Sequence, residues 1–112
     1  MGNIIPNLTP QQINDIRTSA YFAKSSCDTF QDAKTQSVNI SNKTLTFKNY
    51  VQHTPHNDKV IAASGELDKI AQGLKDQYAK SDKVSPAFCK IKFTSIETSA
   101  ETMQKIIGDK PR

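Results

Sequence analysis

The sequence of 112 residues predicts a small, mainly all-α domain, a bundle of the four-helix type held by one disulfide. In three stretches, apolar residues recur at intervals of three and four, which is the spacing of one face of an α-helix. Each stretch begins with residues that typically start a helix. Cys27 and Cys89 lie on two of these apolar stripes. Because this length suits a single domain, we expect 1–112 to form one unit with flexible ends at 1–8 and 109–112.

The first predicted helix spans about residues 10–35. Thr9 is a typical N-cap residue, Pro10 suits the first turn, and Gln12 completes a capping box. The apolar or small residues that follow have intervals of 3, 4, 3, 4 and 3: Ile13, Ile16, Ala20, Ala23, Cys27 and Phe30. Because this stripe has no break, the sequence indicates one continuous helix.

The segment from Ser37 to Thr54 has a less regular pattern. Its apolar residues alternate with polar ones around a polar centre, which fits a short β-hairpin. A short helix over about 38–52, with Phe47, Tyr50 and Val51 on one face, fits nearly as well. Because the rest of the chain is helical, we favour a helix or irregular packing here, and the hairpin stays an alternative.

The next predicted helix spans 58–80 and follows Asn57 and Asp58, either of which can act as its N-cap. Gly65 and Gly73 each lower helix propensity by about 1 kcal/mol relative to alanine. The apolar stripe nevertheless passes through both glycines, so the pattern still favours a helix. Its members are Val60, Ala63, Leu67, Ile70, Leu74 and Tyr78.

The last predicted helix spans 86–107. Ser85-Pro86 forms an N-cap and first-turn pair, and Gly108 with the later Pro111 indicates a C-terminal stop. The apolar residues have intervals of 4, 3, 4, 3 and 4: Cys89, Phe93, Ile96, Ala100, Met103 and Ile107. Residues 88–93 also partly alternate in polarity, but the long stripe favours a helix over a strand.

The number of helical passes decides whether the two cysteines can meet. Cys27 lies late in the first predicted helix, and Cys89 lies in the first turn of the last. With three passes these helices would be parallel, and the cysteines would lie at opposite ends. A fourth pass through the middle segment makes them antiparallel and brings the cysteines together. We favour a disulfide, which persists outside the reducing cytosol; two buried free thiols are the alternative.

Motifs for catalysis, metal binding and nucleic-acid binding are missing from the sequence. It contains no Gly-rich phosphate loop, nucleophile motif or His-Glu metal signature, and His53 and His56 indicate surface loop histidines. The net charge of +4 is spread over lysines interleaved with acidic residues, unlike a basic patch with stacking aromatics. No apolar run is long enough to cross a bilayer. We therefore expect no catalytic residue, metal or cofactor, and a protein as the partner.

A second set of apolar residues lies beside the stripes: Tyr21, Phe22, Ile61, Phe88 and Ile91. We expect them mainly to pack under the middle segment, against Leu45, Phe47 and Val51. Alternatively, some of them line a groove for the amphipathic helix of a partner. The residues that we predict for such a partner-binding groove are Phe22, Ile70, Leu74, Tyr78, Phe93 and Ile96.

Three segments of the chain resemble the pilotins of bacterial type II secretion. Residues 20–27 (AYFAKSSC) are similar to the end of the first pilotin helix; Leu67 to Tyr78 and Ser85 to Cys89 are similar to the third helix and the start of the fourth. The resemblance implies a periplasmic four-helix domain, bridged from first helix to last, that captures a helical tail of the outer-membrane secretin. Residues 28–56 lack the tryptophan-containing element of that family.

A second resemblance is to periplasmic immunity proteins that neutralise type VI amidase effectors. It rests on Cys89-Lys90 and the amphipathic helix that follows, and implies a protruding polar loop, such as 37–49 or 80–84, that blocks a toxin. A third interpretation is an intracellular helical adaptor with reduced cysteines. We favour a secretin pilotin of the periplasm, and expect that a signal segment has been removed and that any membrane association used a removed lipid anchor.

Overall fold

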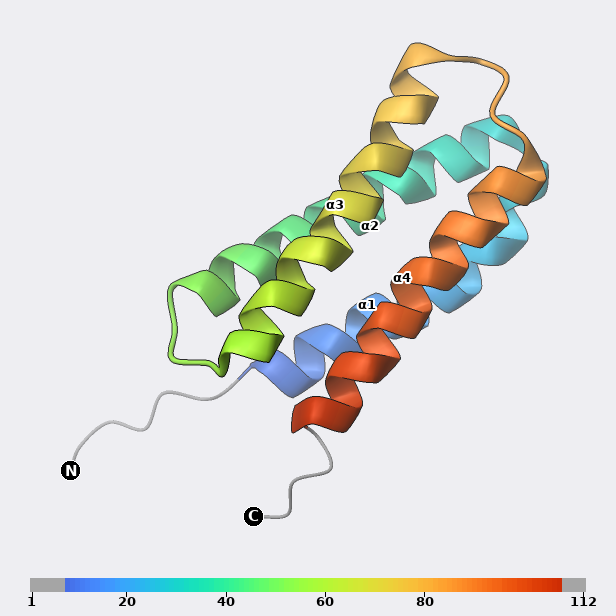
Figure 1. The fold of residues 1–112 in the computed structure, drawn as a ribbon. Helices are drawn as coiled ribbons and strands as arrows, with labels where there is room; N and C mark the ends of the chain where they lie inside the picture. Colours follow the sequence, from blue (N-terminus) through green and yellow to red (C-terminus); the bar gives the residue numbers. More distant parts are fainter. Residues whose placement is uncertain (1–7, 108–112) are drawn as a thin grey trace.

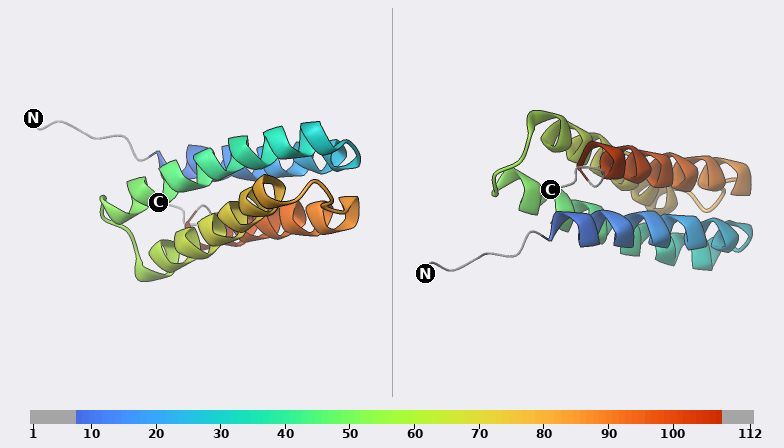
Figure 2. Two further views of the ribbon diagram at one scale, coloured as in Figure 1. Left: turned by 90° about the horizontal axis from the view of Figure 1, so that it is seen from above. Right: turned by 90° about the horizontal axis from the view of Figure 1, so that it is seen from below.

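The computed structural model describes residues 8–107, which form four α-helices and one short 3₁₀ helix (Figure 1). The elements are α1 (Thr9–Ala23), η1 (Lys24–Asp28), α2 (Phe30–Gln52), α3 (Asp58–Lys80) and α4 (Pro86–Ile107). Successive helices run in opposite directions, so α1 and α4 are antiparallel (Figures 1 and 2). The fold is therefore the all-α, four-pass bundle that the sequence predicts.

The core is built from the predicted apolar stripes. Almost all of their members are buried, whereas Phe30, Ala63, Ile70 and Ile107 lie at the edge of the core and are partly buried. The helices pack most extensively in two pairs, α2 with α3 and α1 with α4. The seams between α1 and α2 and between α3 and α4 are the less extensive contacts of the bundle.

The first helix ends earlier than the predicted 10–35, because the chain turns after Ala23. Ser25 Oγ donates a hydrogen bond to the carbonyl of Phe22 at 2.9 Å, and Ser26 Oγ donates to the carbonyl of Ala23 at 2.6 Å. Such side-chain bonds compete with regular helix geometry. Thr29 then adopts an extended backbone, φ −119° and ψ 121°, and α2 begins. The prediction of one continuous helix is therefore wrong. The turn gives no sign in the sequence, because it contains neither glycine nor proline and because the apolar residues keep their helical spacing through it.

The middle segment is a full helix, so the hairpin alternative is wrong and the short helix at 38–52 is too short. The stripe of α2 has intervals of 4, 3, 4, 3 and 4, but half of it is small or polar: Ala33, Ser37, Ile40, Thr44, Phe47 and Val51. The hydroxyls of Ser37 and Ser41 each donate to a backbone carbonyl three residues earlier in the helix, and the Thr44 hydroxyl donates to Asp68 of α3. These bonds allow polar residues to be buried, and they conceal the helical period in the sequence.

Two of the three predicted helix starts are confirmed. Asn57 Oδ1 accepts from the backbone nitrogens of Lys59 and Val60 at the start of α3. Ser85 Oγ accepts from the backbone nitrogen of Phe88, with Pro86 in the first turn of α4. Thr9, by contrast, is the first residue of α1, after Leu8 at the N-cap position, and it is buried. Its hydroxyl lies 2.6 Å from Nε2 of His56, so its role is to fix the α2–α3 loop.

The remaining terminal predictions fall largely outside the described residues. The C-terminal stop at Gly108 and Pro111 lies beyond them, as do the expected flexible ends except Leu8. Leu8 is exposed, and its backbone nitrogen donates to the hydroxyl of Tyr50 at 3.0 Å. The two histidines belong to the α2–α3 connection, as predicted, although His56 is partly buried.

Cys27 and Cys89 form a disulfide that joins η1 to the first turn of α4. It lies at the end of the bundle opposite the α2–α3 loop (Figure 1). The bridge links residues 62 apart in the sequence, and the chain-entropy model assigns up to roughly 4 kcal/mol to a loop of this length. It confirms the predicted four-pass topology and indicates a non-reducing compartment. Within 8–107, no helix has the length and apolarity needed to cross a membrane.

Candidate functional site

The seams of the bundle differ in what joins their helices. α2 and α3 are linked by a hydrogen bond from Thr44 Oγ1 to Asp68 Oδ1 at 2.8 Å. α1 and α2 are linked by an ion pair, and η1, which follows α1, is linked to α4 by two ion pairs and the disulfide. Among the described residues, no hydrogen bond or ion pair joins α3 to α4. Apolar packing alone holds this seam.

A groove runs along the outside of this seam. One part has a volume of about 430 Å³, and a second part of about 310 Å³ adjoins it. The two parts share Gln77 and Phe88, so together they follow α3 from Glu66 to Ser81. We call this surface the α3–α4 groove; its lining residues are Glu66, Lys69, Ile70, Gly73, Leu74, Gln77, Ser81, Lys83, Val84, Ser85, Phe88 and Lys92.

The middle of the groove is apolar. Leu74 is buried and Ile70 half-buried, so they lie at its base, while Phe88 keeps 36% of its surface exposed on the α4 side. Gly73 adds to the hollow because it has no side chain. A Cβ atom built at Gly73 would meet no neighbouring atom within 4 Å. The groove therefore has room for an apolar side chain from another molecule.

Positive charge borders this apolar middle on both sides. Lys69 lies on α3, Lys92 lies on α4, and Lys83 lies in the loop between them. Among the described residues, Glu66 is the only acidic residue that lines the groove. The Nζ atom of Lys92 is 5.3 Å from the ring centroid of Phe88, a cation–π distance. None of these three lysines forms an ion pair within the described part of the chain.

The structure brings together two of the six residues that we predict for a partner-binding groove. Ile70 and Leu74 lie in the α3–α4 groove. Tyr78, Phe93 and Ile96 are core residues, with at most 2% of their surface exposed, and they do not line the groove. They continue the central stripes of α3 and α4, whereas the groove lies on the neighbouring face. Burial also raises the pKa of the Tyr78 hydroxyl above its ordinary value.

The sixth residue, Phe22, lies on another surface. It has 64% of its surface exposed and lines a hollow of about 410 Å³ between the end of α1 and the start of α2. The hollow is otherwise mostly polar, and its other lining residues are Ala23, Ser25, Ser26, Asp32, Thr35 and Gln36. Phe22 is therefore not part of the α3–α4 groove.

The extra apolar residues do not pack under the middle segment as we expect from the sequence. Tyr21, Phe22, Phe88 and Ile91 are exposed, and so is Leu45. Phe47 and Val51 are buried as expected, and Ile61 is partly buried. The sequence signal for the groove was the position of Phe88, off the stripe of its helix. Gly73, Gln77 and Lys92 gave no comparable signal, because a glycine and two polar residues on a helix usually indicate a solvated surface.

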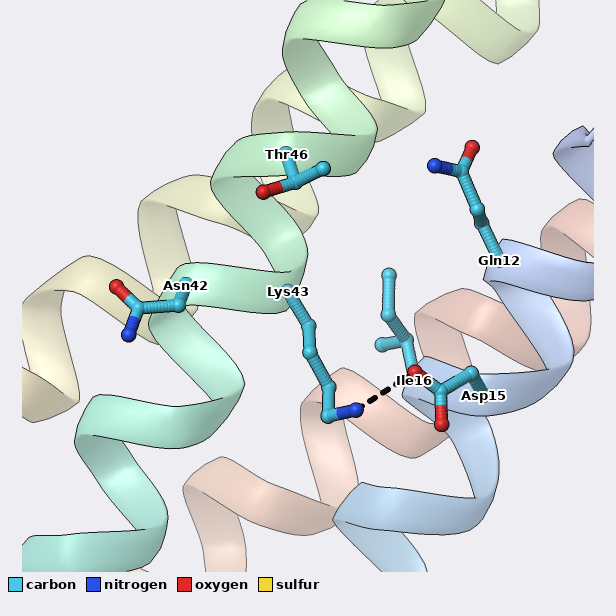
Figure 3. Close-up of a pocket in the computed structure, with 6 residues that line it drawn as sticks. All are labelled: Gln12, Asp15, Ile16, Asn42, Lys43 and Thr46. Carbon is cyan, nitrogen blue, oxygen red and sulfur yellow. Dashed lines mark hydrogen bonds and ion pairs between the residues drawn. The ribbon is translucent and has the colours of Figure 1, made fainter.

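Another hollow, of about 230 Å³, lies on the α1–α2 seam (Figure 3). Its lining residues are Gln12, Asp15, Ile16, Asn42, Lys43 and Thr46. Figure 3 shows Lys43 reaching from α2 towards Asp15 on α1, and their charged atoms are 2.7 Å apart. The charges of this hollow therefore neutralise each other.

The described residues offer no metal-binding group of three or more His, Cys, Asp or Glu side chains. The buried carboxylate of Asp68 has structural partners instead. It accepts hydrogen bonds from Thr44 and from Gln72 Nε2, and Lys48 Nζ lies 3.7 Å away. Asp68 therefore ties α2 to α3.

Two alternative interpretations are affected by the structure. Of the loops expected for an immunity protein, 37–49 lies inside α2, and 80–84 forms part of the α3–α4 connection beside the groove. The first loop assignment is therefore wrong. The disulfide also argues against an intracellular adaptor with reduced cysteines.

No protein-family model, curated protein or solved structure matches this chain. The resemblances to pilotins and to immunity proteins stay predictions from the sequence. The α3–α4 groove is the candidate site on the strength of its own geometry.

Proposed function

We propose that this protein is a periplasmic protein-binding module of the pilotin type. It holds an amphipathic helix from the C-terminal segment of an outer-membrane secretin in the α3–α4 groove. The groove itself carries the proposal, because it is a surface hollow with apolar residues in its middle and polar residues along its edges. Helix-in-groove recognition needs this combination of an apolar floor and polar edges.

The dimensions of the groove suit a short helix. The part of α3 from Glu66 to its end at Lys80 spans about 21 Å at a rise of 1.5 Å per residue. A partner helix of about four turns would cover this length and present apolar residues at intervals of three and four. One such residue would occupy the space beside Gly73, between Leu74 and Phe88.

The disulfide supports this use of the groove. Cys89 follows Phe88 directly, and its bond to Cys27 holds the start of α4 on η1. The bond thereby restricts movement of α4 towards α3 at the loop end of the seam. A groove held in its binding shape loses less conformational entropy when the partner binds. The same bond requires a non-reducing compartment, which the periplasm provides.

The experiment that tests this proposal fills the groove. In Gly73→Leu the new side chain enters the space that a partner would occupy, and leucine favours a helix more than glycine does. We expect the variant to be at least as stable as the native protein. Its affinity for a synthetic peptide of the secretin C-terminal segment from the same organism should fall at least about tenfold, as measured by calorimetric titration.

Gly65→Leu is the matched control. Gly65 lies on the same helix, a Cβ atom there also meets no neighbouring atom within 4 Å, and Gly65 does not line the groove. This variant should bind the peptide like the native protein. Failure of the native protein to bind, or equal binding by both leucine variants, would refute the proposed function.

A further inference from the structure

We infer that the segment bound in the α3–α4 groove is acidic, with Asp or Glu residues on both borders of its apolar face. This inference rests on the proposed use of the groove and adds the chemistry of the partner. The groove is lined by three lysines and one glutamate. An acidic partner therefore matches the charge of its borders.

Elsewhere in the bundle, four lysines are paired with carboxylates of a neighbouring element. Lys24 lies 2.7 Å from Glu97 of α4, and Lys48 lies 3.7 Å from Asp68 of α3. Across the α1–α2 seam, Lys43 Nζ lies 2.7 Å from Asp15 Oδ2. Lys90 of α4 completes the set, 3.3 Å from Asp28 in η1. Each of these four lysines has a carboxylate on the neighbouring element.

The α3–α4 seam lacks such carboxylates. Lys69 on α3 and Lys92 on α4 border the apolar floor from opposite sides, and neither forms an ion pair among the described residues. Lys83 adds a third positive charge at the loop end of the groove. Carboxylates on a bound segment would supply the partners that the chain supplies on its other seams.

The apolar and charged parts of the groove are close enough to act on one segment. Lys92 contacts the ring of Phe88 at 5.3 Å, and Phe88 and Leu74 line the same hollow. Suppose that a partner helix places an apolar residue beside Gly73. The partner residues on either side of its apolar face would then lie near Lys92 and Lys69. The acidic residues belong at these flanking positions.

A selection from random peptides tests this inference without assuming a partner. The probe is a phage-displayed library of random peptides of about 15 residues. It is selected on the oxidised native protein after removal of peptides that bind Gly73→Leu. We expect the selected sequences to be enriched in Asp and Glu beside apolar residues at helical spacing.

The outcomes of the selection separate the two proposals. Enrichment of apolar helical patterns without acidic residues would overturn the inference and support the proposed function. If no peptide depends on the space beside Gly73, both proposals fail.

Charge reversal gives the second readout. The double variant Lys69→Glu/Lys92→Glu should bind a selected acidic peptide at least about tenfold more weakly. For the native protein, the affinity should fall as salt is added. The matched control is Lys34→Glu/Lys59→Glu, which changes the net charge equally at exposed positions outside the groove. Equal weakening in both double variants would overturn a specific role for the groove lysines.

Discussion

The α1–α2 and α3–α4 seams are both less extensively packed than the other two, and both carry surface hollows, yet their chemistry differs. The α1–α2 hollow is crossed by the Asp15–Lys43 ion pair, and amide and hydroxyl side chains surround it. The α3–α4 groove has an apolar floor, and its lysines have no acidic partner in the described chain. The comparison indicates what makes a seam of this bundle a candidate binding surface: apolar side chains that no other element covers, and lysines that no carboxylate of the chain neutralises.

The largest expected change in stability comes from the core beneath the α3–α4 seam, and it contrasts with the small change expected in the groove above it. Phe93→Ala should lower the free energy of unfolding by about 3–5 kcal/mol, because it leaves a cavity in the core. Phe88→Ala should cost about 1 kcal/mol or less but weaken peptide binding. Urea unfolding of both variants, with calorimetric titration of the second, checks this contrast. Similar destabilisation by the two changes would show that Phe88 belongs to the core.

The next effect concerns the bond that holds one end of the α3–α4 seam. Removing it in Cys27→Ala/Cys89→Ala should lower the free energy of unfolding by about 2–5 kcal/mol. Peptide affinity should also fall, because the start of α4 is no longer fixed on η1. Urea unfolding with and without a reductant is the measurement. The reductant should lower the free energy of unfolding of the native protein and leave that of the double variant unchanged. Unchanged peptide affinity in the double variant would show that the disulfide does not determine the shape of the groove.

The smallest effect is expected at the α1–α2 seam. Asp15→Ala removes an ion pair whose members are both substantially exposed, so the free energy of unfolding should fall by only about 0.2–1 kcal/mol. Peptide binding should be unchanged. A chemical-denaturation curve and a titration with the selected peptide test this. Loss of binding in Asp15→Ala would instead place a second binding surface on this seam.

The sequence predicted three helical stripes, the start of α3 and α4 and the pairing of the cysteines correctly, because these depend on apolar periodicity and local caps. It did not reveal the turn at 24–29, since two serine hydroxyls bond to the end of α1 where glycine or proline would have been recognisable. The length of α2 was hidden for a related reason. Its inner face contains Ser37 and Ser41, whose hydroxyls are bonded within the helix itself.

The candidate site was harder to predict than the fold. Ile70 and Leu74 were found because they lie on the stripe of α3, but the same rule selected Phe93 and Ile96, which are core residues. A stripe gives the direction of the core and does not show where two helices separate at the surface. That separation depends on how all four helices pack, so the pairing of Gly73 with Phe88 could be seen only in three dimensions.

The placement of the two sulfur atoms has a consequence for how the protein matures. Residue 89 must reach an oxidising environment before the link can form, so most of the chain has to be delivered first. Once the helices have assembled, at most 3% of either cysteine is exposed. Thiols in solution then reach the sulfurs only when α4 detaches locally. The finished protein should therefore keep its bond through brief exposure to mild reductants.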